Sequence, residues 1–165
     1  LNEIINENNN FANKLQLKLI GKVDYSVDNS IQDFKLQKYV KRFSYLAHNK
    51  VISHQKSSKV LLLMVNNTPN SKGIITGKVF EYMASNRPIL VIGPEDGDLA
   101  KIIMATKSGV VCGYDNEEKL KKVILDLFNN KLIFNADFEK YSRKNLTKNL
   151  SIILDNHLNN INAND

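Results

Sequence analysis

The sequence has few of the residues that carry covalent or metal-dependent chemistry. It contains one cysteine, three histidines and no tryptophan in 165 residues. A single thiol excludes a disulfide framework and any zinc or iron–sulfur site that needs several thiolates. The longest aliphatic run, Val60 to Val65, is about a third of a membrane span. Disulfide-rich folds, multi-thiolate metal centres and membrane-spanning helices are therefore not expected.

Arginine is also scarce, which limits what the positive charge can mean. The 23 Lys+Arg and 17 Asp+Glu residues give a formal charge of +6. The arginines are Arg42, Arg87 and Arg143, and the lysines are scattered along the chain. Arginine usually makes the bidentate contacts to phosphates and bases, and no basic run here alternates with aromatic residues. We therefore expect no nucleic-acid partner.

What the sequence does contain is an alternation of short apolar runs with helical patterns. The runs predict strands at residues 15–20, 39–46, 60–65, 88–92 and 110–114. Apolar residues at helical spacing predict core-facing helices at residues 27–36, 48–57, 78–85, 98–106, 117–128 and 144–158. Parallel neighbours need crossover helices, so this order predicts an α/β, Rossmann-like three-layer domain. Its mostly parallel sheet would have about five strands, with helices on both faces.

We expect a single domain over residues 1–158, followed by a polar tail at residues 159–165. The asparagine cluster at residues 8–10 is interpreted in the same way, as a frayed or solvated polar end. In an open α/β sheet, ligands bind outside the carboxyl ends of the strands. The loops after Ile20, Leu46, Val65 and Ile92 are therefore the places to expect chemistry.

The strongest local pattern joins a long polar loop to the helix at residues 78–85. Thr76 can cap that helix through its hydroxyl, and the free amides at a helix start favour an anion. Gly73 and Gly77 would let a phosphate approach the backbone, and Lys78 could supply a positive charge. The pattern favours an anion site.

Glu81 lies one turn into the same helix. At helical pitch it is about 200° round from Val79, which belongs with Tyr82 and Met83 to the apolar face. A carboxylate held there could accept hydrogen bonds from both hydroxyls of a ribose. An ordinary surface glutamate on a capped helix fits the local pattern as well.

The histidines and the cysteine carry less information. His48 follows a predicted strand and could contact a ligand, whereas His54 has no partner at metal-ligand spacing. His157 is expected at the surface of the last helix. Cys112 lies in an apolar strand, where packing is the expected role.

An acidic cluster follows the strand at residues 88–92. Glu95, Asp96 and Asp98 could hold Mg²⁺ or could serve the start of the next helix. We favour capping, with Asp98 as the N-cap.

The segment from Gly73 to Leu90 resembles the nucleotide-sugar segment of the group 1 (family 4) retaining glycosyltransferases. Residues 43–48, the helix after them and residues 58–63 are similar to the part of that family that precedes the donor loop. Residues 108–111 and 141–147 are similar to its closing portion. The resemblance runs from about Leu15 to Leu158, and its specific part is the donor segment.

The resemblance implies half of a GT-B fold. Such enzymes have two Rossmann-like domains, of which the C-terminal one holds the nucleotide-sugar donor and the N-terminal one binds the acceptor. This chain resembles the C-terminal domain alone. Because the sequence begins with Leu rather than Met, we expect the acceptor domain and the first strand of the donor domain to lie upstream.

Site residues follow from the same resemblance. Glu81 matches the glutamate that binds the donor ribose. The turn under the pyrophosphate and sugar is matched by Ile75, Thr76, Gly77 and Lys78, and the loop beside the base by residues 45–48, which include Tyr45 and His48. Many members carry an acidic residue eight positions before the ribose-binding glutamate, where this chain has Gly73. The resemblance therefore does not supply that contact to the transferred sugar.

The implied activity is transfer of a sugar from a UDP- or GDP-linked donor to a glycan or lipid-linked acceptor held by the other domain. The family needs no metal, and we expect no cofactor. A cytoplasmic location is implied, with peripheral association at the inner face of the membrane as a further expectation. Two alternatives remain: a GT-B-type sugar-nucleotide epimerase fragment, and a non-catalytic α/β interaction domain whose positive charge meets an anionic surface.

Overall fold

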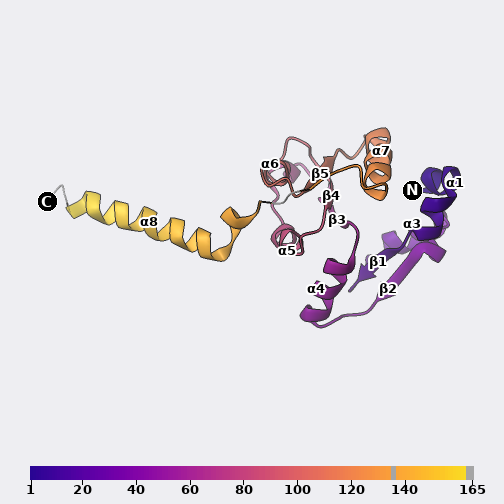
Figure 1. Cartoon of the computed structure of the whole chain (residues 1–165), viewed down its shortest axis with the longest axis horizontal. Coiled ribbons are helices and arrows are strands. Elements are labelled where there is room, and N and C mark those ends of the chain that lie inside the picture. Colours follow the sequence, from indigo (N-terminus) through magenta and orange to yellow (C-terminus); the bar gives the residue numbers. More distant parts are fainter. Residues whose placement is uncertain (135–136, 163–165) are drawn as a thin grey trace.

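The computed structural model describes residues 1–134 and 137–162 as an α/β fold with parallel strands (Figure 1). The strands are β1 (Leu17–Ile20), β2 (Val40–Phe43), β3 (Leu61–Met64), β4 (Ile89–Ile92) and β5 (Gly109–Cys112). β1 pairs with β2, and β3, β4 and β5 pair in that order, all in parallel. The α/β class, the number of strands and their parallel direction are confirmed.

The strands do not form one continuous sheet. In the part of the chain that the structure describes, β1 and β2 form a two-stranded sheet and β3, β4 and β5 a three-stranded sheet. The strands that were expected in a single sheet therefore form two sheets, and the break falls between β2 and β3. The alternation of strands and helices in a sequence fixes the order of the elements but not the pairing of strand edges.

The three-stranded sheet is covered on both faces. One face packs against α5 (Lys78–Ala84) and α6 (Asp98–Ala105), with a core that includes Val91, Val79 and Ile103. The other face packs against α7 (Glu117–Phe128) through Leu90 and Cys112. Burial of these apolar side chains is the main stabilising contribution of this half.

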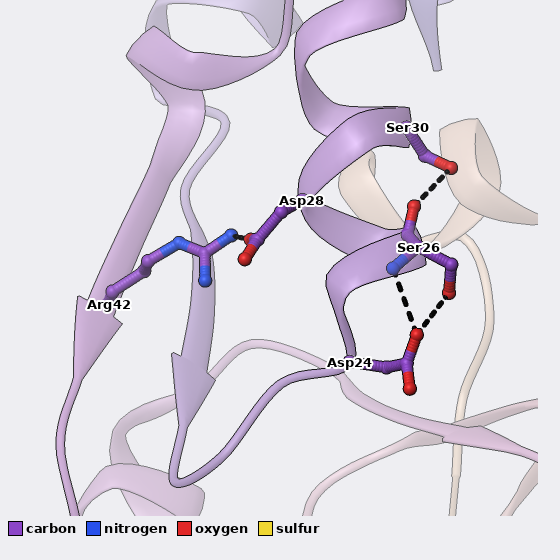
Figure 2. Close-up of polar contacts among 5 residues, drawn as sticks. All are labelled: Asp24, Ser26, Asp28, Ser30 and Arg42. Carbon is purple, nitrogen blue, oxygen red and sulfur yellow. Dashed lines mark hydrogen bonds and ion pairs between the residues drawn. The ribbon is translucent and has the colours of Figure 1, made fainter.

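The two-stranded sheet is covered less completely. Its crossover helix α3 (Tyr25–Asp33) contains no buried residue. The start of α3 is stabilised by Asp24, whose carboxylate accepts hydrogen bonds from the amide and hydroxyl of Ser26 at 2.9 and 2.6 Å. An ion pair between Asp28 and Arg42 joins α3 to β2 (Figure 2). This half therefore depends on exposed polar contacts more than the other half does.

The N-terminal segment is helical, contrary to the expectation of a frayed asparagine-rich end. It forms α1 (Asn2–Glu7) and α2 (Asn9–Lys14). The Asn8 side chain accepts a hydrogen bond from the amide of Phe11 at 2.9 Å and so caps α2. Phe11 is only 5% exposed and meets Phe128 of α7 edge to face, with ring centroids 5.2 Å apart.

Helix α4 (His48–Ser57) has the predicted bounds and connects the two sheets in sequence. Its buried Gln55 accepts a hydrogen bond from the hydroxyl of Ser85, just after α5, at 2.9 Å. Short 3₁₀ turns complete the connections: η1 (Gln37–Tyr39), η2 (Ser71–Gly73) and η3 (Glu139–Tyr141).

The last helix, α8 (Arg143–Asn162), extends away from the sheets (Figure 1). It was expected to face the core, but its apolar residues are about half exposed: Leu146, Leu150, Ile153 and Leu154. It also includes residues 159–162 of the predicted polar tail, and residues 163–165 lie outside the described residues. The spacing predicted a helix correctly but could not say what covers its apolar side.

Candidate functional site

The predicted donor segment (residues 73–90) begins in the loop between β3 and α5, at the carboxyl end of the three-stranded sheet. Its loop contains η2, in which the Ser71 side chain is buried and the Lys72 ammonium pairs with Asp96 at 2.5 Å. A Cβ at Gly97, just before α6, would lie 3.0 Å from the carbonyl oxygen of Lys72. The loop therefore packs closely against the start of α6, and glycine at position 97 permits that approach.

The start of α5 differs in one detail from the prediction. Gly77 occupies the N-cap position, and it has no side chain to cap with. The Thr76 hydroxyl nevertheless accepts a hydrogen bond from the amide of Lys78 at 3.2 Å. Open space surrounds the Cα atoms of Gly73 and Gly77 where a Cβ would be. The backbone of this turn is therefore accessible to a ligand.

The two faces of α5 are as predicted. Val79 and Met83 are almost fully buried, and Tyr82 packs against the same core. Burial raises the pKa of the Tyr82 phenol, and the neighbouring Glu81 charge raises it further. Lys78 and Glu81 are exposed on the opposite side, as is Ile75 in the loop before the helix. The helix thus presents a cation and a carboxylate to solvent from a rigidly packed base.

Tyr45 and His48 lie in the connection after β2. Tyr45 is 91% exposed and His48 is the first residue of α4. Both α4 and α5 begin at the carboxyl ends of the strands, and Gln55 and Ser85 join them near their C-termini. In the described ranges this connection makes no hydrogen bond to residues 73–81. In the described residues, no hydrogen bond therefore joins the connection after β2 to the turn before α5.

The acidic cluster after β4 has structural partners. Glu95 accepts a hydrogen bond from the Gly113 amide at 2.7 Å and pairs with Lys119 at 2.9 Å. These contacts lower the pKa of the Glu95 carboxyl, the Lys119 hydrogen bond contributing most. Asp98 is not the N-cap that we predicted, because Gly97 takes that position and Asp98 pairs with Lys101 instead.

No metal centre forms among residues 1–134 and 137–162, where no three His, Cys, Asp or Glu side chains come together. His54 packs its ring on Phe43, with centroids 4.6 Å apart, and so has a structural role. Cys112 is fully buried, and burial raises the pKa of its thiol, which confirms a packing role. His157 is exposed on α8, as predicted.

Sequence reasoning missed one contribution to this edge. The Tyr114 hydroxyl, just after β5, donates a hydrogen bond to the carbonyl oxygen of Asn66, just after β3, at 3.2 Å. Together with the Glu95–Gly113 contact it ties the loops of the three strands to one another. The position of Tyr114 at the end of a predicted strand was the available signal.

Two concave surfaces are found elsewhere. One lies between α3 and β2 and includes Tyr25, Asp28 and Arg42. The other lies over α7 and includes Lys121 and Lys131. Neither contains a residue of the predicted donor segment. No helix in the described part of the chain is both long and apolar enough to cross a membrane.

Comparison with known proteins shows the fold. No family model and no curated protein matches the sequence. Among solved structures, the chain is similar to sucrose-phosphate synthase from Thermosynechococcus elongatus, with a TM-score of 0.55 and 16% sequence identity. The match covers 70% of this chain and 29% of the synthase chain, so this chain spans less than a third of that protein. The chain therefore has a Rossmann-like α/β fold, as does the matching part of the synthase.

Proposed function

We propose that this chain is the nucleotide-sugar-binding domain of a retaining glycosyltransferase of the group 1 (family 4) type. The observation that carries the proposal is the position of Lys78 and Glu81. Both are exposed on the first turn of α5, whose other face is buried. This turn lies at the carboxyl end of the three-stranded sheet, where open α/β sheets bind their ligands.

Each group at this edge has a part in binding the donor. The Glu81 carboxylate accepts hydrogen bonds from the ribose hydroxyls. The Lys78 ammonium and the accessible backbone at residues 73–77 face the pyrophosphate, and Ile75 and Thr76 lie under the sugar. Tyr45 and His48 lie beside the base.

The same arrangement serves the chemical step. When the nucleoside diphosphate departs, negative charge develops on its β-phosphate. The positive charge of Lys78, on the first turn of a helix whose other face is packed, would stabilise that negative charge. The acceptor, a glycan or lipid-linked sugar, would be positioned by a second domain, which holds the reactants together. The isolated chain would therefore bind nucleotide but transfer no sugar.

The donor would carry UDP or GDP, with no metal or cofactor required. We place the reaction in the cytoplasm, at the inner face of the membrane if the acceptor is lipid-linked.

The test is a calorimetric titration of the full chain with UDP and with GDP. We expect one of them to bind with a Kd in the millimolar range. Glu81→Gln should weaken that binding by about tenfold or more, because a charge-assisted hydrogen bond contributes about 1.5–3 kcal/mol. Glu117→Gln removes an exposed carboxylate from the first turn of α7 and serves as the matched control.

Two outcomes would contradict the proposal. One is no heat of binding with either nucleotide at millimolar concentration. The other is equal binding by the wild type and Glu81→Gln. Salt-dependent binding to anionic vesicles without nucleotide binding would favour the interaction-domain alternative instead.

A further inference from the structure

The lysines are scattered along the chain, but the acidic residues are not. Residues 34–80 contain no aspartate or glutamate, so the lysines of this stretch give it a net positive charge. The proposed donor site uses only Lys78 of the stretch, and much of the remaining charge lies on β2, on α4 and in the turns beside them. A charge asymmetry of this kind favours binding of an anionic partner.

Strand β2 has a free edge. Among the described residues it pairs on one side only, with β1. The amide of Gly21 donates a hydrogen bond to the Phe43 carbonyl at 3.0 Å, so Phe43 directs its backbone groups towards β1. Successive residues of a parallel strand alternate in this direction, so Arg42 directs its amide and carbonyl away from β1. The edge therefore offers backbone hydrogen-bonding groups to a further strand.

A groove borders this edge on the side of α3. It is lined by α3 residues that include Tyr25 and Ile31, by the turn before β2, and by Val40 and Arg42 of β2. Arg42 and Asp28 face each other there as an ion pair (Figure 2). A strand edge beside a helix-walled groove is an arrangement that binds extended peptides, because the edge pairs with the peptide backbone and the groove accepts alternate side chains.

The opposite face of β2 carries like charges next to each other. Lys41 is in register with Lys18 of β1, and neighbours in register point to the same face. Phe43 lies on that face too and packs its ring on His54 of α4, a helix without aspartate or glutamate. In the part of the chain that the structure describes, neither lysine forms an ion pair. Like charges at opposite positions destabilise a sheet, so a carboxylate beside Lys41 would stabilise this one.

We propose that the free edge of β2 binds an acidic segment of a partner protein, which adds to the sheet as an extended strand. Side chains alternate along a strand, so the segment would place carboxylates on the side of Lys41 and Lys18 and apolar side chains in the groove beside α3. Its backbone would bond to the free groups of Arg42. The surface belongs to the β1–β2 half, and the proposal holds whether or not α5 binds a nucleotide sugar.

A second copy of this chain is a poor occupant of the same edge. Two β2 strands that paired with each other would bring cationic side chains close together across the new contact. Lysine on an edge strand is a common means of preventing such pairing. The charges that exclude a like strand favour an acidic one, so they determine which partner binds as well as how tightly it binds.

The experiment measures the binding of labelled synthetic peptides to the full chain by fluorescence anisotropy at low salt. One peptide alternates Glu with Val and the other alternates Lys with Val, and both have blocked ends. We expect the Glu–Val peptide to bind at least about tenfold more tightly. A peptide that alternates Glu with Pro has the same charge but cannot form a regular strand, and it should bind at least about tenfold more weakly than the Glu–Val peptide.

Charge reversal locates the site. Lys41→Glu should weaken binding of the Glu–Val peptide by about tenfold or more and should strengthen binding of the Lys–Val peptide, because the charge that faces the added strand changes sign. Lys122→Glu makes the same change at an exposed position on α7 and is the matched control. Amide hydrogen exchange at Arg42 should slow when the Glu–Val peptide binds, since a free amide becomes paired.

Four results would overturn the proposal. The first is no binding of the Glu–Val peptide by the wild type, and the second is equal binding of the Glu–Val and Lys–Val peptides. The third is equal weakening by Lys41→Glu and Lys122→Glu, and the fourth is binding of the Glu–Pro peptide as tight as that of the Glu–Val peptide. Sedimentation supplies a further check: a dimer in which the Arg42 amide is already protected would assign the edge to a second copy and contradict the proposal.

Discussion

The β1–β2 half and the β3–β5 half of this molecule share the same alternation of strand and helix, but they bury very different fractions of their side chains. In the β3–β5 half, Ile89, Val91 and Ile103 are at most 1% exposed. In the β1–β2 half, every residue of β1 is only partly buried, β2 exposes Lys41 and Arg42, and α3 buries no residue. Pattern alone therefore does not make a core, because a strand needs covered faces and paired edges as well.

The difference teaches where the stability of the fold lies. Burial of apolar area is the dominant favourable contribution to folding, and two-stranded sheets are marginal on their own. We expect the β3–β5 half to contribute the larger share of the free energy of unfolding. The β1–β2 half should open first. The donor segment belongs to the more stable half.

The largest difference in stability should appear when one isoleucine in each half is replaced by alanine. Ile103→Ala in α6 removes a fully buried side chain and should lower the free energy of unfolding by about 2–5 kcal/mol. Ile31→Ala in α3 removes a partly buried one and should cost about 1 kcal/mol or less. Urea denaturation of both variants measures the difference. Equal losses would show that the two halves contribute alike.

The second effect concerns the contact between the halves. Ser85→Ala leaves the buried oxygen of Gln55 without its donor, which should cost about 1–3 kcal/mol. Ser53→Ala, an exposed serine on α4, is the control and should change stability by less than about 0.5 kcal/mol. Hydrogen exchange should quicken in β1 and β2 more than in β4 and β5. Uniform quickening would contradict separate opening of the halves.

A pH effect should be visible in the β3–β5 half. The pKa of Glu95 is lowered below its ordinary value of 4.5 by Lys119 and the Gly113 amide. Its contribution to stability is therefore complete above about pH 4.5 and is lost as pH falls through the lowered pKa. Glu95→Gln should flatten the acid limb of stability in thermal melts from pH 7 to pH 3, whereas Glu117→Gln should leave it steep. If stability falls as steeply with acid in Glu95→Gln as in the wild type, the contacts of Glu95 do not stabilise the connection between the loops after β4 and β5.

The smallest effect is expected at the ion pair of the β1–β2 half (Figure 2). Arg42→Gln should change the free energy of unfolding by about 0–1 kcal/mol, since both partners are exposed. High salt should reduce the difference further. A loss above 2 kcal/mol would mean that polar contacts stabilise this half as strongly as the core stabilises the other.

Much of the fold was predictable because strong local signals agree. The bounds of α4 and α7 match the prediction, and Asn116 caps α7 through its side chain at 3.1 Å. The α1–α2 segment was missed because its asparagines suggested a solvated end. The informative residues were the apolar Ile4 and Phe11, both of which are buried.

What could not be predicted depends on distant partners. A local pattern does not say which strand edges pair, so it could not predict the division into two sheets. Nor does it say whether another surface covers the apolar residues of α8, which are exposed. At the site, the faces of α5 followed from helical spacing. The roles of Glu95 and Tyr114 did not, because their partners lie 18 and 48 residues away.

The measurement that bears most directly on the proposed function is a map of amide chemical-shift changes as UDP or GDP is added to the ¹⁵N-labelled chain. We expect the changes to cluster at residues 73–81, with a second group at residues 45–48, and to vanish at residues 73–81 in Glu81→Gln. Changes confined to the concave surface at Tyr25, Asp28 and Arg42, or spread evenly over the surface, would contradict the assignment of the donor site to α5.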